Sequence, residues 1–283
     1  MPESIKQIKS RIRSIGNTRK ITGAMQMVSV ANLKHTEDLL ASSREYYRCM
    51  EGMFNDLFAV DAGVSHPFLK GSPGLSVGLC VITSDTGLCG SYNAAVIKAA
   101  EEFVLKSQGI PVRMSFVGKK GFTYFKKRGY DVSGGLRQVK GRYSFSSADE
   151  ISSVLSRQFL EGNAGSVYVA HMHYESLSRY RPFVAGLLPL EKPAGRAPDF
   201  ILDPDAGKIA LELLPKFIAA KIRLLLVESL MAEYGLRMIS MKAASDNAQE
   251  LRNMLIQMRN KARQASVTRE MIEIISGSGM RQE

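Results

Sequence analysis

The chain has 283 residues, 45% of them hydrophobic, which is enough for one large or two modest domains with a buried core. Its formal net charge of +11 favours an acidic partner, and nucleic acid, a membrane surface or an acidic protein would each satisfy it. Three cysteines without a CxxC motif argue against a disulfide framework, and no segment has the pattern of a membrane span or a signal peptide.

The N-terminal part, residues 1–60, is predicted to be one long helix. Between Ile5 and Leu57 it has three glycines and no proline, so helix breakers are scarce. At ~1.5 Å per residue this helix is roughly 80 Å long. The first 34 residues hold seven Lys or Arg and one acid, Glu3. Because no aromatics are interleaved to stack bases, we interpret this charge as a solvated face or a surface for an acidic protein.

Residues 75–192 alternate strand patterns with helix patterns, which predicts a Rossmann-like α/β domain with a mostly parallel sheet. An S-x-x-E capping box at Ser147 and Glu150 predicts the start of a helix that ends near Leu160. The other predicted elements are strands over 75–83 and 112–117, a helix over 92–107, and two strands within SVYVAHMHYES and RPFVAGLLPL, the last ending at Pro189.

The C-terminal part, residues 205–283, is predicted to be a second long helix. Small or apolar residues recur in it about every 3.56 residues, between the coiled-coil value of ~3.5 and the straight-helix value of ~3.6. Pro215 either kinks this helix or marks its start. Two long apolar stripes would be left in water unless they pair, so we predict that the terminal helices form an antiparallel coiled-coil rod. Many seam residues are Ala, Ser, Thr or Asn, which indicates a rod that contacts other proteins.

Three motifs admit a chemical interpretation and a structural one. The segment Ser84–Ser91 follows a strand, where phosphate loops occur, but it matches neither GxGxxG nor a Walker A motif and indicates a tight turn. His171 and His173 share a strand face that could bind a metal, but no third ligand is near in sequence. The run from Lys119 to Arg128 suits either a single-strand nucleic-acid binder or a surface helix with Phe122 and Phe125 turned inward; we favour the helix.

No arrangement of nucleophile, base and orienting group is recognisable among the four histidines and three cysteines. We therefore predict no catalytic residues, no cofactor, no metal and no nucleic-acid partner.

Several blocks, spread in order along the chain, resemble the γ subunit family of F-type ATP synthases, the central rotor shaft. The C-terminal blocks are the most specific, and they include MKAASDN and NKARQASVTRE. The matching segments are 8–30 (IKSRIRSIGNTRKITGAMQMVSV), 84–90 (SDTGLCG), 187–190 (LLPL), 237–238, 241–247, 260–270 and 273–277. Gly23 departs from the pattern, because the family usually carries lysine there, and the segment that underlies chloroplast thiol switching is missing.

The resemblance implies a non-catalytic central-stalk rotor that couples ion-driven ring rotation to conformational change in catalytic β subunits, and so to ATP synthesis. Implied partners are the α and β subunits, the ε subunit and the membrane c-ring. The implied location is peripheral, on the cytoplasmic face of a bacterial plasma membrane. By position in the motifs, Met25 and Arg237 would lie near an acidic β-subunit lever, and Arg263, Gln264 and Thr268 would contact a β-subunit loop. Each of the five could instead be a seam or surface residue of the rod.

Two other functions stay open from the sequence. An unrelated coiled-coil adaptor would share the long helices but would have no reason to carry the RQASVT block. A nucleotide-dependent α/β enzyme would bind ATP or NAD at the end of the sheet.

Overall fold

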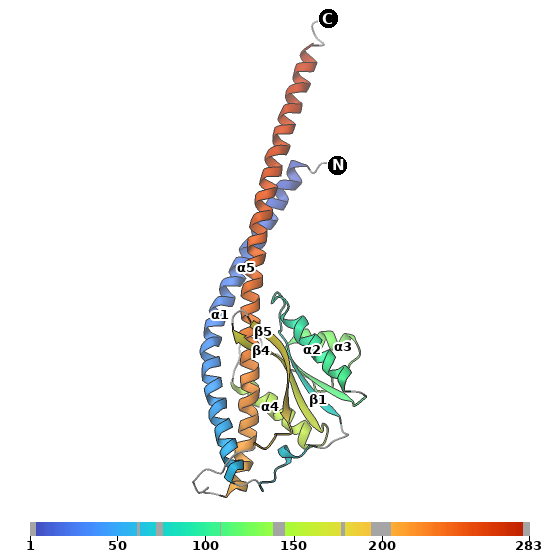
Figure 1. Cartoon of the computed structure of the whole chain (residues 1–283). Coiled ribbons are helices and arrows are strands. Elements are labelled where there is room, and N and C mark those ends of the chain that lie inside the picture. The colour runs from blue at the N-terminus through green and yellow to red at the C-terminus, as the bar shows by residue number, and fades with distance from the viewer. Residues whose placement is uncertain are drawn as a thin grey trace. The chain divides into compact units, whose positions relative to one another are not determined.

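The computed structural model describes residues 4–60, 63–71, 76–107, 109–137, 145–176, 179–193 and 205–279. The chain forms two compact units, one of residues 1–29 with 238–283 and one of residues 30–237. The two long helices, α1 (Ile5–Val60) and α5 (Ala206–Gly279), contribute to both units (Figure 1). The first helix was predicted from the scarcity of glycine and proline and the second from its apolar period, and both are confirmed. The division into 1–60, 75–192 and 205–283 stays a prediction.

The unit of residues 30–237 contains a five-stranded sheet in the order β3-β2-β1-β4-β5. Strands β1, β2, β3 and β4 pair in parallel, and β5 is antiparallel to β4. The predicted mostly parallel sheet is therefore confirmed. The bounds are β1 (Val77–Ile82), β2 (Val112–Val117), β3 (Leu136–Arg137), β4 (Ser166–Ser176) and β5 (Arg179–Leu188).

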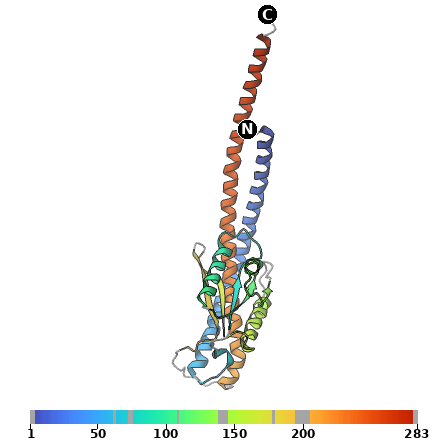
Figure 2. The same ribbon diagram turned by 90° about the vertical axis from the view of Figure 1, so that its right-hand side faces the viewer.

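Helices cover both faces of the sheet. The side chains of a strand point alternately to the two faces, so a strand that is apolar throughout needs a cover on each face. In β1, Leu79 and Val81 pack in one apolar cluster, and Cys80 and Ile82 pack in the other. The first cluster includes α2 (Tyr92–Lys106) and α3 (Lys119–Lys127), and the second includes α1, α4 (Phe145–Leu160) and α5. Figure 1 shows α2 and α4 on opposite sides of the strands, and Figure 2 gives the same ribbon after a turn of 90°.

Within this unit α1 and α5 run antiparallel, as the sequence predicts. The ring of Phe217 in α5 stacks on Tyr47 and Phe54 of α1, with centroids 5.7 and 4.6 Å apart. Farther along α5, Glu228 pairs with Arg44 of α1. Residue numbers in α1 therefore decrease as those of their partners in α5 increase, which makes the two helices antiparallel. Pro215 lies inside α5, which begins at Ala206, so Pro215 does not mark the helix start.

Two local predictions had opposite outcomes. The basic run over 119–128 contains α3, in which Phe125 is fully buried. The ring centroids of Phe122 and Phe116 are 5.8 Å apart. The helix with both phenylalanines turned inward is therefore confirmed. The capping box at Ser147 is wrong, because α4 already begins at Phe145 and Ser147 lies inside it. An S-x-x-E spacing fits a helix interior as well as a helix start, so the motif alone does not locate the first turn.

Gly118, which precedes α3, allows a close approach of two loops. Its φ is +88°, and a Cβ there would lie 1.9 Å from the carbonyl oxygen of Thr83. Gly129 also has a positive φ, +76°, but a Cβ there would meet nothing within 4 Å.

We therefore expect Gly118→Ala to destabilise the chain by several kcal/mol, and Gly129→Ala to cost only the ~1 kcal/mol of a strained backbone. Denaturant unfolding of the two variants measures the difference between clash and strain. Equal losses of unfolding free energy would show that the Thr83 contact is not what requires glycine at position 118.

Candidate functional site

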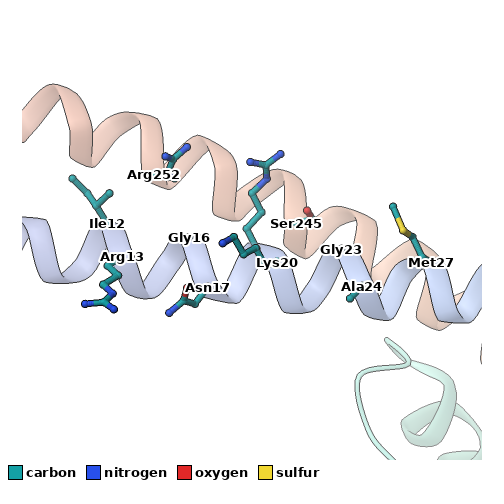
Figure 3. A pocket seen from close by; sticks show the side chains of 11 residues that line it. Ile12, Arg13, Gly16, Asn17, Lys20, Gly23, Ala24, Met27, Ser245 and Arg252 are labelled. Carbon is teal, nitrogen blue, oxygen red and sulfur yellow. The ribbon is translucent and has the colours of Figure 1, made fainter.

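An open, basic groove lies between α1 and α5 in the unit of residues 1–29 and 238–283. Its volume is about 700 Å³, and Figure 3 shows its lining residues. Among the described residues that line it there is no acid, so the groove suits a negatively charged partner. The lining residues are Ile12, Arg13, Gly16, Asn17, Arg19, Lys20, Gly23, Ala24, Met27, Ser245 and Arg252.

Small residues create this groove. Gly16 and Gly23 are seven positions apart, which places them on the same side of α1 about two turns from each other. A Cβ at either position would meet no atom within 4 Å, so the helix backbone is open there. Ser245 adds little bulk from the α5 side (Figure 3). The cationic side chains of Arg19, Lys20 and Arg252 therefore surround the exposed α1 backbone at the two glycines.

The same unit leaves many large apolar side chains exposed. Met27 is 76% exposed on α1, and Ile274 is 71% exposed on α5. Apolar residues exposed in such numbers within one unit mark a protein contact rather than a free helix surface. The exposed set in this unit comprises Ile21, Met27, Val28, Ile239, Leu251, Met254, Met258, Val267, Met271, Ile272, Ile274 and Ile275.

Four of the five predicted contact residues lie in this unit. Met25 is half-buried on α1, and Arg263, Gln264 and Thr268 are exposed on α5. The hydroxyl of Thr268 donates to the carbonyl oxygen of Gln264 at 2.9 Å, so these two are linked through one helical turn. The exposure of the three α5 residues leaves them accessible to a partner. Their role as contacts stays a prediction.

Arg237, the fifth predicted contact residue, belongs to the other unit and is buried, with 7% of its surface exposed. Its guanidinium pairs with Glu233 at 2.6 Å. It also donates to the hydroxyl and the carbonyl oxygen of Thr86 and to the carbonyl oxygen of Gly87. Burial raises the pKa of Glu233, and the Arg237 charge opposes that rise. Arg237 therefore ties α5 to the turn after β1.

Residues 84–91 form a turn between β1 and α2, as the sequence predicts, and polar groups within and beside the turn hold it. Asp85 accepts a hydrogen bond from the backbone N–H of Lys119 at 3.0 Å. Asn93 contacts Ser84 and the sulfur of Cys89, at 2.7 and 3.1 Å. Cys89 is 1% exposed, and burial raises the pKa of its thiol, which makes it a poor nucleophile.

Helix α5 fills the end of the sheet at which a Rossmann fold binds nucleotide. The ends of β1 and β2, at Thr83 and Gly118, face Ser229 and Glu233 of α5 across a cavity of only about 20 Å³. A space of that size holds roughly one water molecule. This cavity therefore has no room for a nucleotide while α5 is in place.

The histidine pair on β4 has no further ligand among the described residues, in which no cluster of three or more His, Cys, Asp or Glu could hold a metal. His171 is buried, and this burial lowers its pKa to about 4, so its ring is neutral at pH 7. In the part of the chain that the structure describes, no helix is both long and apolar enough to cross a membrane.

Comparison with known proteins decides the family. A family model described as ATP synthase matches residues 4–279. The ATP synthase gamma chain of Anaeromyxobacter sp. is 33% identical over 284 residues, covering 97% of this chain and 98% of the relative. That of Geobacter metallireducens is 34% identical over 281 residues, with 97% and 98% covered. The chain belongs to the ATP synthase gamma chain family.

Solved structures agree on the fold of this gamma chain. A chain of the Euglena gracilis mitochondrial ATP synthase, in a structure of OSCP, F1 and c-ring, matches with a TM-score of 0.68. It is 17% identical, and the match covers 97% of this chain and 93% of that one. A chain in the central stalk and c-ring structure of the Tetrahymena thermophila enzyme matches with a TM-score of 0.63 at 22% identity, with 80% and 99% covered.

Membership in this family confirms the predicted identity and makes the chain a non-catalytic subunit of ATP synthase. The match along nearly the full length excludes an unrelated coiled-coil adaptor, and membership in the family of this non-catalytic subunit argues against the nucleotide-dependent enzyme.

Sequence reasoning missed the groove and the buried carboxylates of α5. Gly16 and Gly23 gave a signal, since two glycines with heptad spacing in one helix expose backbone on one face. The sequence also contained a signal for the buried carboxylates. Glu228 and Glu233 are isolated acids within an otherwise apolar stretch, and a buried acid needs a polar or charged partner.

The buried Glu233–Arg237 pair predicts a pH-dependent variant. Arg237→Met leaves an unpaired buried carboxylate, which costs about 3–5 kcal/mol at neutral pH. Without Arg237, burial, together with the nearby charge of Asp85, holds the folded-state pKa of Glu233 above the unfolded value. The penalty is therefore absent below the unfolded pKa of about 4.3 and grows as the pH rises from there through the folded-state pKa.

Denaturant unfolding at acid and neutral pH checks this. In the matched double variant Glu233→Gln, Arg237→Met the bonds to Thr86 and Gly87 are also lost, but no charge is left buried. It should recover part of the stability at neutral pH and lose the pH dependence. If both variants respond equally to pH, the charge of Glu233 is not the cause.

Proposed function

We propose that this gamma chain is the central-stalk rotor of an F-type ATP synthase, coupling ion-driven ring rotation to conformational change in the catalytic β subunits. The observation that carries the proposal is the exposed apolar and basic surface of α1 and α5 in the unit of residues 1–29 and 238–283. Such a surface is stable in water only when other subunits surround it. A shaft surrounded and contacted by α and β subunits meets that requirement.

The groove suits an acidic segment of a β subunit. Its cations, including Arg19, Lys20 and Arg252, lie in an open site of about 700 Å³. Exposed ion pairs contribute only ~0–1 kcal/mol each, so they can exchange from one β subunit to the next without trapping the rotor. Because the shaft lacks three-fold symmetry, each β subunit meets a different face, and this differential contact shifts its nucleotide-binding state.

Met25, Arg263, Gln264, Thr268 and Arg237 are the proposed rotor–stator contacts. The exposure of the three residues on the C-terminal part of α5 supports their part in this proposal. Arg237 is engaged with Thr86 and Gly87, so a contact with a β subunit requires that its guanidinium leave that turn or share it.

Further proposed partners are the ε subunit and the membrane c-ring, as expected for the base of a central stalk. The Tetrahymena structure that matches this fold contains a central stalk and a c-ring, which supports the proposal. The proposed location is peripheral, on the cytoplasmic face of a bacterial plasma membrane.

Reconstitution tests the proposed function directly. The α and β subunits of the same complex, mixed with this chain, should form an assembly whose ATP hydrolysis depends on the chain and whose rotation a bead attached to exposed Cys49 reports. Hydrolysis that is equal with and without the chain would refute the rotor assignment. Calorimetry with ATP should show no binding to the chain alone, since α5 occupies the crevice.

The proposed α5 contacts make a separate prediction. A triple alanine variant of Arg263, Gln264 and Thr268 should fold normally, because all three side chains are exposed, yet lower ATP-driven rotation about tenfold, or ~1.4 kcal/mol. Lys261→Ala, exposed on the same helix, is the matched control and should rotate like the unaltered chain. Full rotation by the triple variant would remove these residues from the proposed contact set.

A further inference from the structure

One buried carboxylate joins three elements of the unit of residues 30–237. Glu228 lies on α5 among apolar neighbours and is only 4% exposed. An ionised carboxylate is costly to bury unless charged or polar groups pair with it. Glu228 has such partners, and they come from α1 and β4, elements far from it in sequence.

The two oxygens of Glu228 bind different partners. Oε1 accepts a hydrogen bond from Arg44 of α1 at 3.0 Å, and Oε2 lies 2.8 Å from Nδ1 of His173 on β4. Arg44 also donates to the carbonyl oxygen of Tyr174, at 3.0 Å, so α1 is tied to β4 as well as to α5. Each contact bridges at least 55 positions of sequence, and the largest separation is 184.

The next residue of α5 strengthens the same joint. The hydroxyl of Ser229 accepts a hydrogen bond from the backbone N–H of Met172, at 3.3 Å. Consecutive residues of α5 thus meet consecutive residues of β4, Glu228 with His173 and Ser229 with Met172. The pattern fixes one register between this helix and this strand.

The charged and titratable groups around the joint come from four elements. The neutral ring of His171 lies 6.3 Å from that of His173, and Arg181 of β5 is opposite His173 in the strand register and pairs with Glu175 at 2.9 Å. The groups are Glu37 and Arg44 of α1, His171, His173, Tyr174 and Glu175 of β4, Tyr180 and Arg181 of β5, and Glu228 of α5.

Apolar packing alone would hold these elements together without fixing their rotation, because the hydrophobic effect has no direction. Charge-assisted hydrogen bonds do have direction, and buried ones can specify register even where they add little net stability. The Glu228 joint supplies such contacts at the place where α1, β4 and α5 meet.

We propose that Glu228, held by Arg44 and His173, is a positioning residue that locks α5 against α1 and the sheet and transmits twist between them. This inference rests on the proposed rotor function, because only a rotating subunit needs such a lock. Loosening the joint lets the α/β domain turn relative to α5 under load. ATP hydrolysis then continues while less rotation reaches the membrane ring.

The experiment uses the complete ATP synthase in vesicles, with variants Glu228→Gln and Arg44→Gln. Arg44 has 45% of its side chain exposed, so its replacement opens no cavity in the core, and Glu228 keeps His173 as a partner. The matched control is Arg48→Gln on the same helix, whose partner Glu45 is 59% exposed. The measurements are ATP hydrolysis rate, ions transported per ATP, and circular dichroism at the assay temperature.

We expect both joint variants to hydrolyse ATP at the unaltered rate while ions transported per ATP fall about twofold or more, and the control to change neither. An unaltered ratio in folded Arg44→Gln overturns the proposal, and this variant decides the matter if Glu228→Gln does not fold. A ratio that falls equally in Arg48→Gln overturns it too. Failure of the proposed function looks different, since the unaltered chain would then support neither rotation nor transport.

Discussion

The pairing of α1 with α5 in the unit of residues 30–237 is the contact on which the rest of this chain depends. The stacked rings of Tyr47, Phe217 and Phe54 bring together segments from the two ends of the sequence. The same apolar cluster includes one face of the sheet and α4, so the α/β domain and the helix pair share a single core. Neither helix could bury its apolar face without the other, and the sheet supplies the chain reversal that makes them antiparallel.

The two units use the same pair of helices in different ways. In the unit of residues 30–237, large side chains such as Leu214 and Ile218 are fully buried, which gives a closed interior. In the unit of residues 1–29 and 238–283, Gly16, Gly23 and Ser245 leave a groove, and apolar side chains remain exposed. A tightly packed seam stabilises the chain by itself, whereas a sparse seam leaves apolar surface for partners. The size of the seam residues thus distinguishes the unit that is stabilised by its own packing from the unit that leaves apolar surface for partners.

Sequence periodicity predicted the helices and the parallel sheet because these follow from local repeats, a period near 3.6 for α5 and a continuous apolar run for β1. The capping box at Ser147 failed because its four-residue pattern fits any position within a helix. Predicting the groove would have required knowing which α5 residues lie opposite Gly16 and Gly23, and the sequence does not give that register. The partners of Glu228 could not be predicted either, since Arg44 and His173 are brought to it by tertiary packing across 184 and 55 positions.

Buried charge on α5 also holds the turn after β1, where related α/β folds bind a ligand. In such folds the turn after the first strand and the crevice beside it bind an anionic cofactor. Here Arg237 donates to the Thr86 and Gly87 carbonyl oxygens of that turn, and Glu233 neutralises the arginine while its own helix fills the crevice. The turn thus has a side chain of α5 bound to its carbonyl oxygens. These contacts attach the turn after β1, and with it the sheet, to α5.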